Sequence, residues 1–262
     1  MRALYTAATG MLAQELNVEV ISNNIANMRT TGFKRQRAEF QDLLYQSLRR
    51  VGTSTSDQGT MLPVGLDIGA GVKVVGTPRI MSQGSVLPTE KPLDVAVRGE
   101  GLFRVQMPDG TISYTRAGSF EIDAEGRLVT PEGYILDPVI TIPQDATSVT
   151  ISQVGMVQVM QPGQTLPSEI GQLQLAKFVN KSGLQPIGDN LFLETAASGA
   201  PQTGNPGEDG FGTLLQAHLE QANVNAVTEI SDLIAAQRAY SMNARVISAA
   251  DEMLQSTASM SR

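Results

Sequence analysis

The sequence predicts an α+β protein in which long N- and C-terminal helices pair as a coiled coil and flank an all-β central domain. Three observations support this fold class. Apolar residues recur at heptad spacing near both ends of the chain, and neither proline nor glycine interrupts the C-terminal segment after Gly212. Between the ends, turn residues recur about every eight to ten residues, as in a meandering antiparallel sheet or sandwich.

Residues 1–50 are predicted to form an N-terminal helical segment that packs against residues 213–262. Its seam is a line of apolar residues at seven-residue spacing: Leu4, Met11, Val18 and Ile25, with Ile21 beside them. Apolar residues at helical spacing resume after Gly32, which predicts a second, shorter helix through about residue 47.

A polar cluster that contains Asn23, Asn24 and Asn27 closes the first helix. Asparagine is a weak helix former, but its side chain both donates and accepts hydrogen bonds. Within a helix seam such side chains can fix the register of two helices, whereas at a helix end they can fray the last turn. The residues alone leave both alternatives open.

Residues 51–71 are rich in Gly, Ser, Thr and Pro and contain few apolar anchors. This composition predicts an extended segment, and a stretch of about twenty such residues inside a compact domain is typical of functional or partner-ordered segments. Residues 72–195 are predicted to be the all-β domain, with turns at Pro108-Asp109-Gly110 and Pro131-Glu132-Gly133. Residues 196–212 are predicted to be a linker.

Residues 213–262 are predicted to form one C-terminal helix. Its heptad seam comprises Ala226, Ile230, Leu233, Gln237, Tyr240, Ala244, Ile247, Asp251 and Leu254. A helix of about 40 residues would be roughly 60 Å long, which is longer than a compact domain. It therefore needs a partner helix, and the N-terminal segment supplies one.

Composition excludes several classes of protein. The net charge of −7 argues against nonspecific nucleic-acid binding. The absence of cysteine excludes disulfides, zinc-thiolate sites and cysteine nucleophiles. The sequence has neither a signal-peptide h-region nor an apolar run long enough to span a membrane, so we expect a cytoplasmic protein or one exported by a signal-independent route.

Candidate catalytic patterns lack the partners that their chemistry requires. The single histidine, His218, has no G-x-S-x-G motif to serve. The run Asp123-x-Glu125-Gly126 resembles the start of a calcium loop but lacks the helical exit with a bidentate glutamate. Gly99 and Gly101 lack the third glycine and the strand-to-helix context of a dinucleotide loop. We predict no catalytic, metal or cofactor site, and no enzyme.

Several motifs resemble a known family. The run Ser22-Asn23-Asn24-Ile25-Ala26-Asn27, followed by Thr31-Gly32-Phe33-Lys34, resembles the N-terminal signature of the flagellar rod and hook family of axial proteins. Asn223-Val224-Asn225, Ala236-Gln237-Arg238-Ala239-Tyr240 and Asp251-Glu252-Met253-Leu254 resemble its C-terminal signature. Residues 94–103 and 114–120 are similar to its shared β-domain, although Leu102 stands where aromatic residues are usual.

The resemblance implies a structural subunit of the bacterial flagellar basal body, exported without a cleaved signal peptide. Chain length and the motifs in residues 62–72 and 188–191 are most similar to subunits of the distal part of the rod. The implied assembly is a helical, rigid rod that transmits motor torque across the periplasm to the hook. The implied partners are further copies of the chain, proximal rod and hook subunits, P- and L-ring proteins and the flagellar type III export apparatus, without nucleic acid or membrane insertion.

The expected assembly interface lies on the two terminal helices. It comprises Leu4, Met11, Val18, Ile21, Ile25, Asn23, Asn24, Asn27, Ile230, Leu233, Gln237, Tyr240, Ile247 and Leu254.

Three alternatives remain open at this point. The chain could be another rod or hook-type axial subunit. It could be a periplasmic enzyme that acts on polysaccharide, which would need two carboxylates about 5 to 10 Å apart. It could also be a coiled-coil adaptor, which would form a defined small complex instead of filaments.

Overall fold

The computed structural model describes residues 2–49, 51–52, 64–164 and 166–260. These residues divide into two compact units. Unit 1 lies within Met1–Ile25, Gln36–Pro78 and Ala226–Arg262, and unit 2 lies within Ala26–Arg35 and Arg79–Asn225. Each unit therefore combines segments that are far apart in the sequence.

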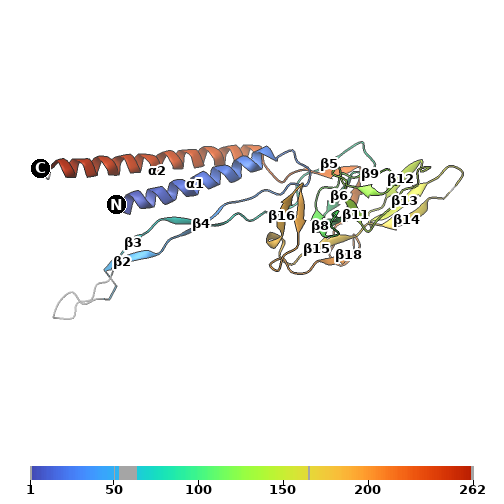
Figure 1. The fold of residues 1–262 in the computed structure, drawn as a ribbon, viewed down its shortest axis with the longest axis horizontal. Helices are drawn as coiled ribbons and strands as arrows, with labels where there is room; N and C mark the ends of the chain where they lie inside the picture. The colour runs from blue at the N-terminus through green and yellow to red at the C-terminus, as the bar shows by residue number, and fades with distance from the viewer. Residues whose placement is uncertain (1, 50, 53–63, 165, 261–262) are drawn as a thin grey trace. The chain divides into compact units, whose positions relative to one another are not determined.

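Unit 1 contains the two long helices, α1 (Arg2–Ala26) and α2 (Ala226–Met260), which run in opposite directions in Figure 1. They contact each other at two levels. Near one end, the Asn24 side-chain amide donates a hydrogen bond of 3.1 Å to Glu229. At the middle of α2, a Cβ on Gly10 would lie only 2.7 Å from the Asn243 side-chain nitrogen. The prediction of contacting terminal helices and a β-rich centre is confirmed.

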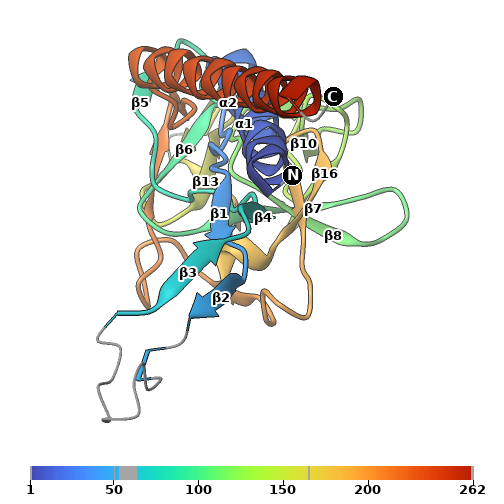
Figure 2. The same ribbon diagram turned by 90° about the vertical axis from the view of Figure 1, so that its left-hand side faces the viewer.

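Residues 33–48 form no helix, contrary to the sequence-based prediction. Instead, β1 (Glu39–Asp42) pairs with β4 (Val72–Gly76), and β2 (Tyr45–Arg49) pairs with β3 (Leu66–Gly69), as Figure 2 shows. The backbone groups of β1 and β2 form hydrogen bonds with strands further along the chain. The periodicity of residues 33–48 alone cannot indicate such partners. Within the predicted segment 51–71, residues 53–63 lie outside the described residues.

Residues 213–225 are not helical, so the predicted start of the C-terminal helix is also wrong. In unit 2, β19 (Thr213–Gln216) pairs with β6 (Val95–Arg98), and β20 (His218–Glu220) pairs with β5 (Val86–Pro88). Leu214 is 1% exposed and belongs to the main core. Burial against the sheet therefore outweighs the local tendency to continue the helix.

The main sheet of unit 2 has the strand order β16-β17-β8-β7-β11-β10-β9, and β15 joins it by pairing with β7 and β18. A smaller sheet has the order β12-β13-β14. The bounds of these strands are β7 (Leu102–Gln106), β8 (Ile112–Thr115), β9 (Glu121–Ile122), β10 (Leu128–Val129), β11 (Ile135–Asp137), β12 (Ser148–Ile151), β13 (Met156–Met160), β14 (Ser168–Gln172), β15 (Leu175–Lys177), β16 (Gln185–Gly188), β17 (Leu191–Leu193) and β18 (Gln202–Gly204).

The main sheet carries a hydrophobic cluster on each face. Neighbouring residues of β7 point to opposite faces, so Phe103 enters one cluster and Leu102 the other. In the larger cluster, the rings of Phe103 and Phe120 meet edge to face at 5.0 Å. In the smaller one, Tyr114 and Phe178 meet in the same way at 4.8 Å. Burial on both faces of this sheet gives unit 2 a core of its own.

Among the described residues, neither long helix combines the length and the apolar content that a bilayer span requires. The same residues bring together no group of three histidine or carboxylate side chains able to hold a metal ion.

Candidate assembly interface and buried ion-pair cluster

The face that α2 turns toward α1 is a stripe of residues at seven-residue spacing. Glu229, Ala236 and Ala250 are buried on this stripe, and Asn243 meets Gly10. The predicted positions Ile230 and Gln237 follow directly after two of these residues and are exposed. A step of one residue turns the helix by about 100°, so part of the predicted seam points away from α1.

The facing surface of α1 is also made of small residues. Ala7 and Ala13 are buried, with Gly10 midway between them. Small side chains let two helices approach closely, which explains why alanine positions instead of Ile230 meet the partner helix. The remaining predicted residues of α1 are half-buried or buried: Leu4, Met11, Val18 and Ile25 are half-buried, and Ile21 is 5% exposed.

Asn24 links three segments of unit 1. It is 1% exposed, and its amide also donates a hydrogen bond of 2.8 Å to the backbone oxygen of Gln36. Its carbonyl oxygen accepts one of 2.9 Å from the backbone nitrogen of Gln36. For Asn24, the structure therefore supports register fixing instead of fraying. Asn27 accepts a hydrogen bond from the Thr30 hydroxyl at 3.2 Å, and Asn23 is exposed.

The strands of unit 1 attach to α1 through Thr9. Its hydroxyl accepts a hydrogen bond of 3.3 Å from the backbone nitrogen of Val72. Next to it, Gly71 has φ of +118°, and a Cβ there would overlap the Thr9 hydroxyl. Glycine is required at this position by both the backbone conformation and the close approach.

Unit 1 leaves many apolar side chains exposed. On α2 they are Val227, Ile230, Ile234, Tyr240, Met242, Val246, Met253, Leu254 and Met260. On or beside the paired strands they include Leu44, Tyr45, Leu48 and Leu66, of which Leu44 is 90% exposed. Leu233 and Ile247 are half-buried on α2. Runs of exposed apolar residues of this extent are typical of surfaces that bind another protein.

Unit 2 contains a buried ion-pair cluster around Glu220. Its two carboxylate oxygens bind Lys34 Nζ and Arg116 Nε, each at 2.6 Å. Glu220 is 1% exposed, Lys34 2% and Arg116 6%. The backbone nitrogen of Gly84 donates a further hydrogen bond of 2.8 Å to the same carboxylate. Three segments distant in the sequence are thereby joined to β20.

Backbone carbonyl groups accept further hydrogen bonds from the two cations. Lys34 Nζ donates to the Ser82 oxygen at 2.9 Å, and Arg116 donates to the oxygens of Val97, Gly99 and Gly101. Burial alone would raise the pKa of Glu220, but attraction by Arg116 and then Lys34 outweighs burial and holds this pKa below its ordinary value. The carboxylate is therefore ionised at neutral pH, which a buried charge tolerates only when it is paired and hydrogen-bonded.

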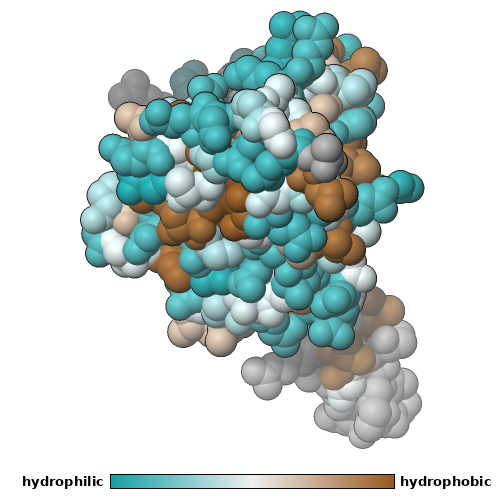
Figure 3. Space-filling view, turned by 90° about the vertical axis from the view of Figure 1, so that its right-hand side faces the viewer, coloured by the Kyte–Doolittle hydropathy of each residue, from teal (hydrophilic) through white to brown (hydrophobic). Residues whose placement is uncertain are grey.

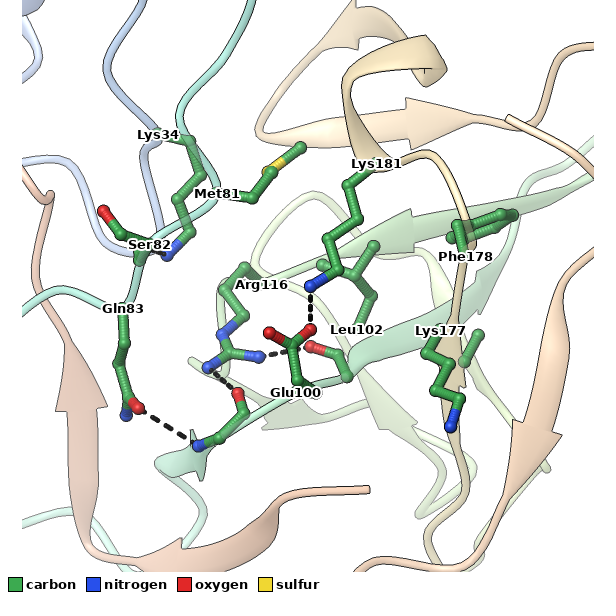
Figure 4. A pocket seen from close by; sticks show the side chains of 13 residues that line it. Lys34, Met81, Ser82, Gln83, Glu100, Leu102, Arg116, Lys177, Phe178 and Lys181 are labelled. Carbon is green, nitrogen blue, oxygen red and sulfur yellow. Dashed lines mark hydrogen bonds and ion pairs between the residues drawn. The ribbon is translucent and has the colours of Figure 1, made fainter. Parts of the chain in front are cut away.

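Beside this cluster lies a pocket of about 120 Å³, shown in Figure 4. Lys34 and Arg116 line it together with Lys177 and Lys181. Lys181 pairs with Glu100, and Lys177 donates to the backbone oxygen of Asp209 at 2.9 Å. Each of these cations already has a partner in the protein.

Asn223 joins two other segments of unit 2 through hydrogen bonds. Its side-chain oxygen accepts from the backbone nitrogen of Arg35 at 2.8 Å, and its amide donates to the oxygens of Ile80 and Ser82 at 2.8 and 3.1 Å. The N-terminal signature contains Lys34, the β-domain motif contains Arg116 and the C-terminal signature contains Asn223. Sequence reasoning did not identify Glu220, because neither Lys34 nor Arg116 differs in the sequence from an ordinary surface charge.

Comparison with known proteins finds family matches over the segments that carry these features. Residues 4–34 match the family described as flagella basal body rod protein, and residues 96–159 match the flagellar hook protein FlgE/F/G D1 domain. Residues 215–260 match the C-terminal family of flagellar basal body rod FlgEFG proteins. The three matches cover both long helices and much of the β-rich region.

Whole-chain relatives carry a single description, flagellar basal-body rod protein FlgG. The relative from Caulobacter vibrioides is 57% identical, over 99% of this chain and 99% of its own length. Relatives from Agrobacterium fabrum and from Buchnera aphidicola subsp. Acyrthosiphon pisum are 49% and 48% identical, each over 97% of both chains. On this similarity over its full length, the chain belongs to the FlgG family of flagellar basal-body rod proteins.

Proposed function

We propose that the chain is a self-assembling structural subunit of the distal rod of the bacterial flagellum, and that the rod transmits motor torque across the periplasm to the hook. Membership of the FlgG family makes the chain a structural component of the basal body. The observation that supports self-assembly best is the exposed apolar surface of unit 1. Along α2 and the β2–β3 pair, residues such as Leu44 and Ile230 stay exposed in a single chain.

Exposed apolar surface of this kind favours association, because burial contributes about 25 cal/mol for each Å² removed from water. In unit 1, the stripe that includes Ala236 and Ala250 meets α1 within the chain, while Ile230, Tyr240 and Leu254 remain available to other copies. We infer that α1 and α2 pair as a coiled coil and that the assembly interface uses those predicted residues on both helices that a single chain leaves exposed or half-buried. Contacts that repeat between identical subunits without closing generate a helical filament.

Unit 2 also leaves apolar side chains exposed, among them Val139, Val154 and Val179. In Figure 3, hydrophobic surface on one face gathers in a band between hydrophilic regions. Such a surface supports contacts with other components as well as with copies of the chain. We propose proximal rod subunits, hook subunits and the P- and L-ring proteins as these components, and the flagellar type III apparatus as the route of export.

We further propose that residues 51–71 form a rod-type segment that fills space between subunits. Their composition supports this role. Shortening the segment should leave unit 2 folded but change the curvature or stiffness of the rod in electron micrographs. Rods that keep their normal shape and bending would contradict the proposal for this segment.

The experiment that tests the proposed function uses a strain that lacks its own copy of the gene. Basal bodies are purified after complementation with the full chain or with a chain that ends at residue 225 and lacks α2. We expect complete rods only with the full chain in negative-stain electron micrographs. Complete rods in the uncomplemented strain would show that the protein is not a required rod subunit. The adaptor and enzyme alternatives predict that outcome.

A further inference from the structure

We propose that neighbouring copies of the chain dock through opposite charges on α1 and α2. An acidic groove beside α1 of one copy receives a basic edge of α2 from the next. This inference rests on the proposed self-assembly and names the surfaces through which part of it occurs.

The acidic groove lies between the two helices of unit 1. It has a volume of about 550 Å³ and is lined by Glu15, Val18, Glu19, Gln237, Tyr240 and Ser241. Glu15 and Glu19 are exposed, and they are the acidic residues of α1. Tyr240, which is 43% exposed, adds an aromatic wall. The groove is therefore open, acidic and partly apolar.

The basic edge lies on α2. A hollow of about 470 Å³ there is lined by Ile234, Gln237, Arg238, Ser241, Met242 and Arg245. Between Asp232 and Asp251, the charged residues of α2 are Arg238 and Arg245, and both are exposed. Ile234 and Met242 beside them are 45% and 59% exposed. The edge therefore combines two cations with apolar side chains that are exposed to water in an isolated chain.

Both hollows share Gln237 and Ser241, so they lie on the two sides of one ridge of α2. On one side of the ridge the hollow contains the carboxylates of α1, and on the other side it contains the guanidinium groups of α2. Among the described residues, Glu15, Glu19, Arg238 and Arg245 take part in none of the ion pairs within the chain. Two complementary surfaces in different places on one chain fit a head-to-tail contact that each added copy can repeat.

The spacing of the charges allows the two surfaces to meet. Glu15 and Glu19 are one turn apart, about 6 Å along the helix, and Arg238 and Arg245 are two turns apart, about 10.5 Å. Arginine and glutamate side chains are long enough to cover this difference, and arginine binds a carboxylate through two parallel hydrogen bonds. Ile234 and Met242 would enter the partly apolar groove and exclude water, which strengthens the ion pairs. Because both halves occur on this chain, a second copy is the occupant that the surfaces specify.

The test reverses the charges in full-length chains expressed in the strain without its own copy. One variant carries Glu15→Arg and Glu19→Arg, a second carries Arg238→Glu and Arg245→Glu, and a third combines all four changes. The matched control is Glu90→Lys with Glu132→Lys, which reverses two exposed charges of unit 2 outside both hollows. Rod length in purified basal bodies is measured by electron microscopy.

Each two-residue variant alone should lower the number of complete rods about tenfold or more, as expected for losing complementary charge pairs at an interface. The combined variant should restore rods. Co-expression of the two defective variants should also restore them, because the basic edge of the first fits the acidic groove of the second, and the reverse pair fits as well. The control should assemble normally.

Normal rods from both two-residue variants would overturn the inference. Failure of the combined variant and of co-expression, with a normal control, would overturn it too, because damage to each chain would then explain the loss. The proposed function has a separate readout in the same experiment. If the unaltered chain is dispensable for rods, the proposed function itself fails.

Discussion

Lys34 and Glu220 lie 186 residues apart in the sequence, yet their side chains form a buried ion pair of 2.6 Å within unit 2. Arg116 binds the other oxygen of the same carboxylate. One acidic side chain thus pairs with two buried cations from two other segments, and its loss would remove the paired carboxylate from both.

Glu220→Ala should therefore strongly destabilise unit 2. Removing one partner of a buried ion pair typically costs about 3–5 kcal/mol, because an uncompensated charge stays buried. Urea unfolding of the full chain, followed by the circular dichroism of the strands, measures this loss. The matched control is Glu121→Ala, which breaks the exposed pair with Lys91 and should change stability little. Equal effects of the two substitutions would contradict the role assigned to the cluster.

The stability of unit 2 should also depend on pH through Glu220. Because its pKa in the folded state lies below the ordinary value of 4.5, the unfolded chain binds a proton first as the pH falls. The stabilisation by Glu220 is complete above that ordinary value and is lost as the pH falls through the folded-state pKa.

The measurement is urea unfolding at several pH values for the unaltered chain and for Glu220→Gln. The variant should show a shallower decline of the free energy of unfolding below pH 4.5, since its side chain does not titrate. If both proteins decline in parallel, Glu220 does not contribute to acid sensitivity.

Gly71→Ala should loosen the strands of unit 1 from α1. The substitution places a side chain at φ of +118° and against the Thr9 hydroxyl, so we expect a loss of about 1–3 kcal/mol. Hydrogen exchange of the Val72 amide, which donates to Thr9, reports the local loss. Gly76→Ala is the control, at the end of the strand that follows Gly71, where a Cβ meets no atom within 4 Å. Adding Thr9→Ala to Gly71→Ala should recover the part of the loss that comes from overlap.

Leu233→Asp or Ile247→Asp should prevent rod formation. Both residues are half-buried on α2, and an unpaired carboxylate at such a position costs several kcal/mol in every subunit of the filament. Motility in soft agar and electron microscopy of basal bodies measure the effect. Ser256→Asp, on an exposed part of α2, is the control and should remain motile. Motile cells with either seam variant would show that these two residues lie outside the assembly interface.

The sequence predicts the contacting terminal helices and the β-rich centre because both depend on local periodicity. Residues 33–48 were misassigned to a helix because apolar residues such as Phe40 and Leu43 fit helical spacing, while the strand partners lie at residues 66–76. Residues 213–225 were misassigned for the same reason, since β6 and β5 precede them by more than a hundred residues. Pairing between distant segments leaves little trace in a short sequence window.

The sequence predicts part of the candidate site, just as it predicts part of the fold. Heptad spacing identifies α2 as an interacting helix, but two stripes of α2 share that spacing. The choice between Ile230 and Glu229 depends on the close approach of Gly10 to Asn243, which lies on the same stripe as Glu229. The Glu220 cluster could not be assembled from sequence, because its three members come from separate segments and each alone resembles an ordinary surface charge.

The pairing of α1 with α2 also determines the order in which the chain can complete its fold. A chain delivered from its N-terminus releases α1 at the start, yet the partner of Asn24 is Glu229, 205 residues later. Most of the stability of a helix in a protein comes from tertiary packing, and α1 packs against α2. The α1 segment must therefore wait for nearly the whole chain, so premature folding of the leading end is disfavoured until α2 has emerged.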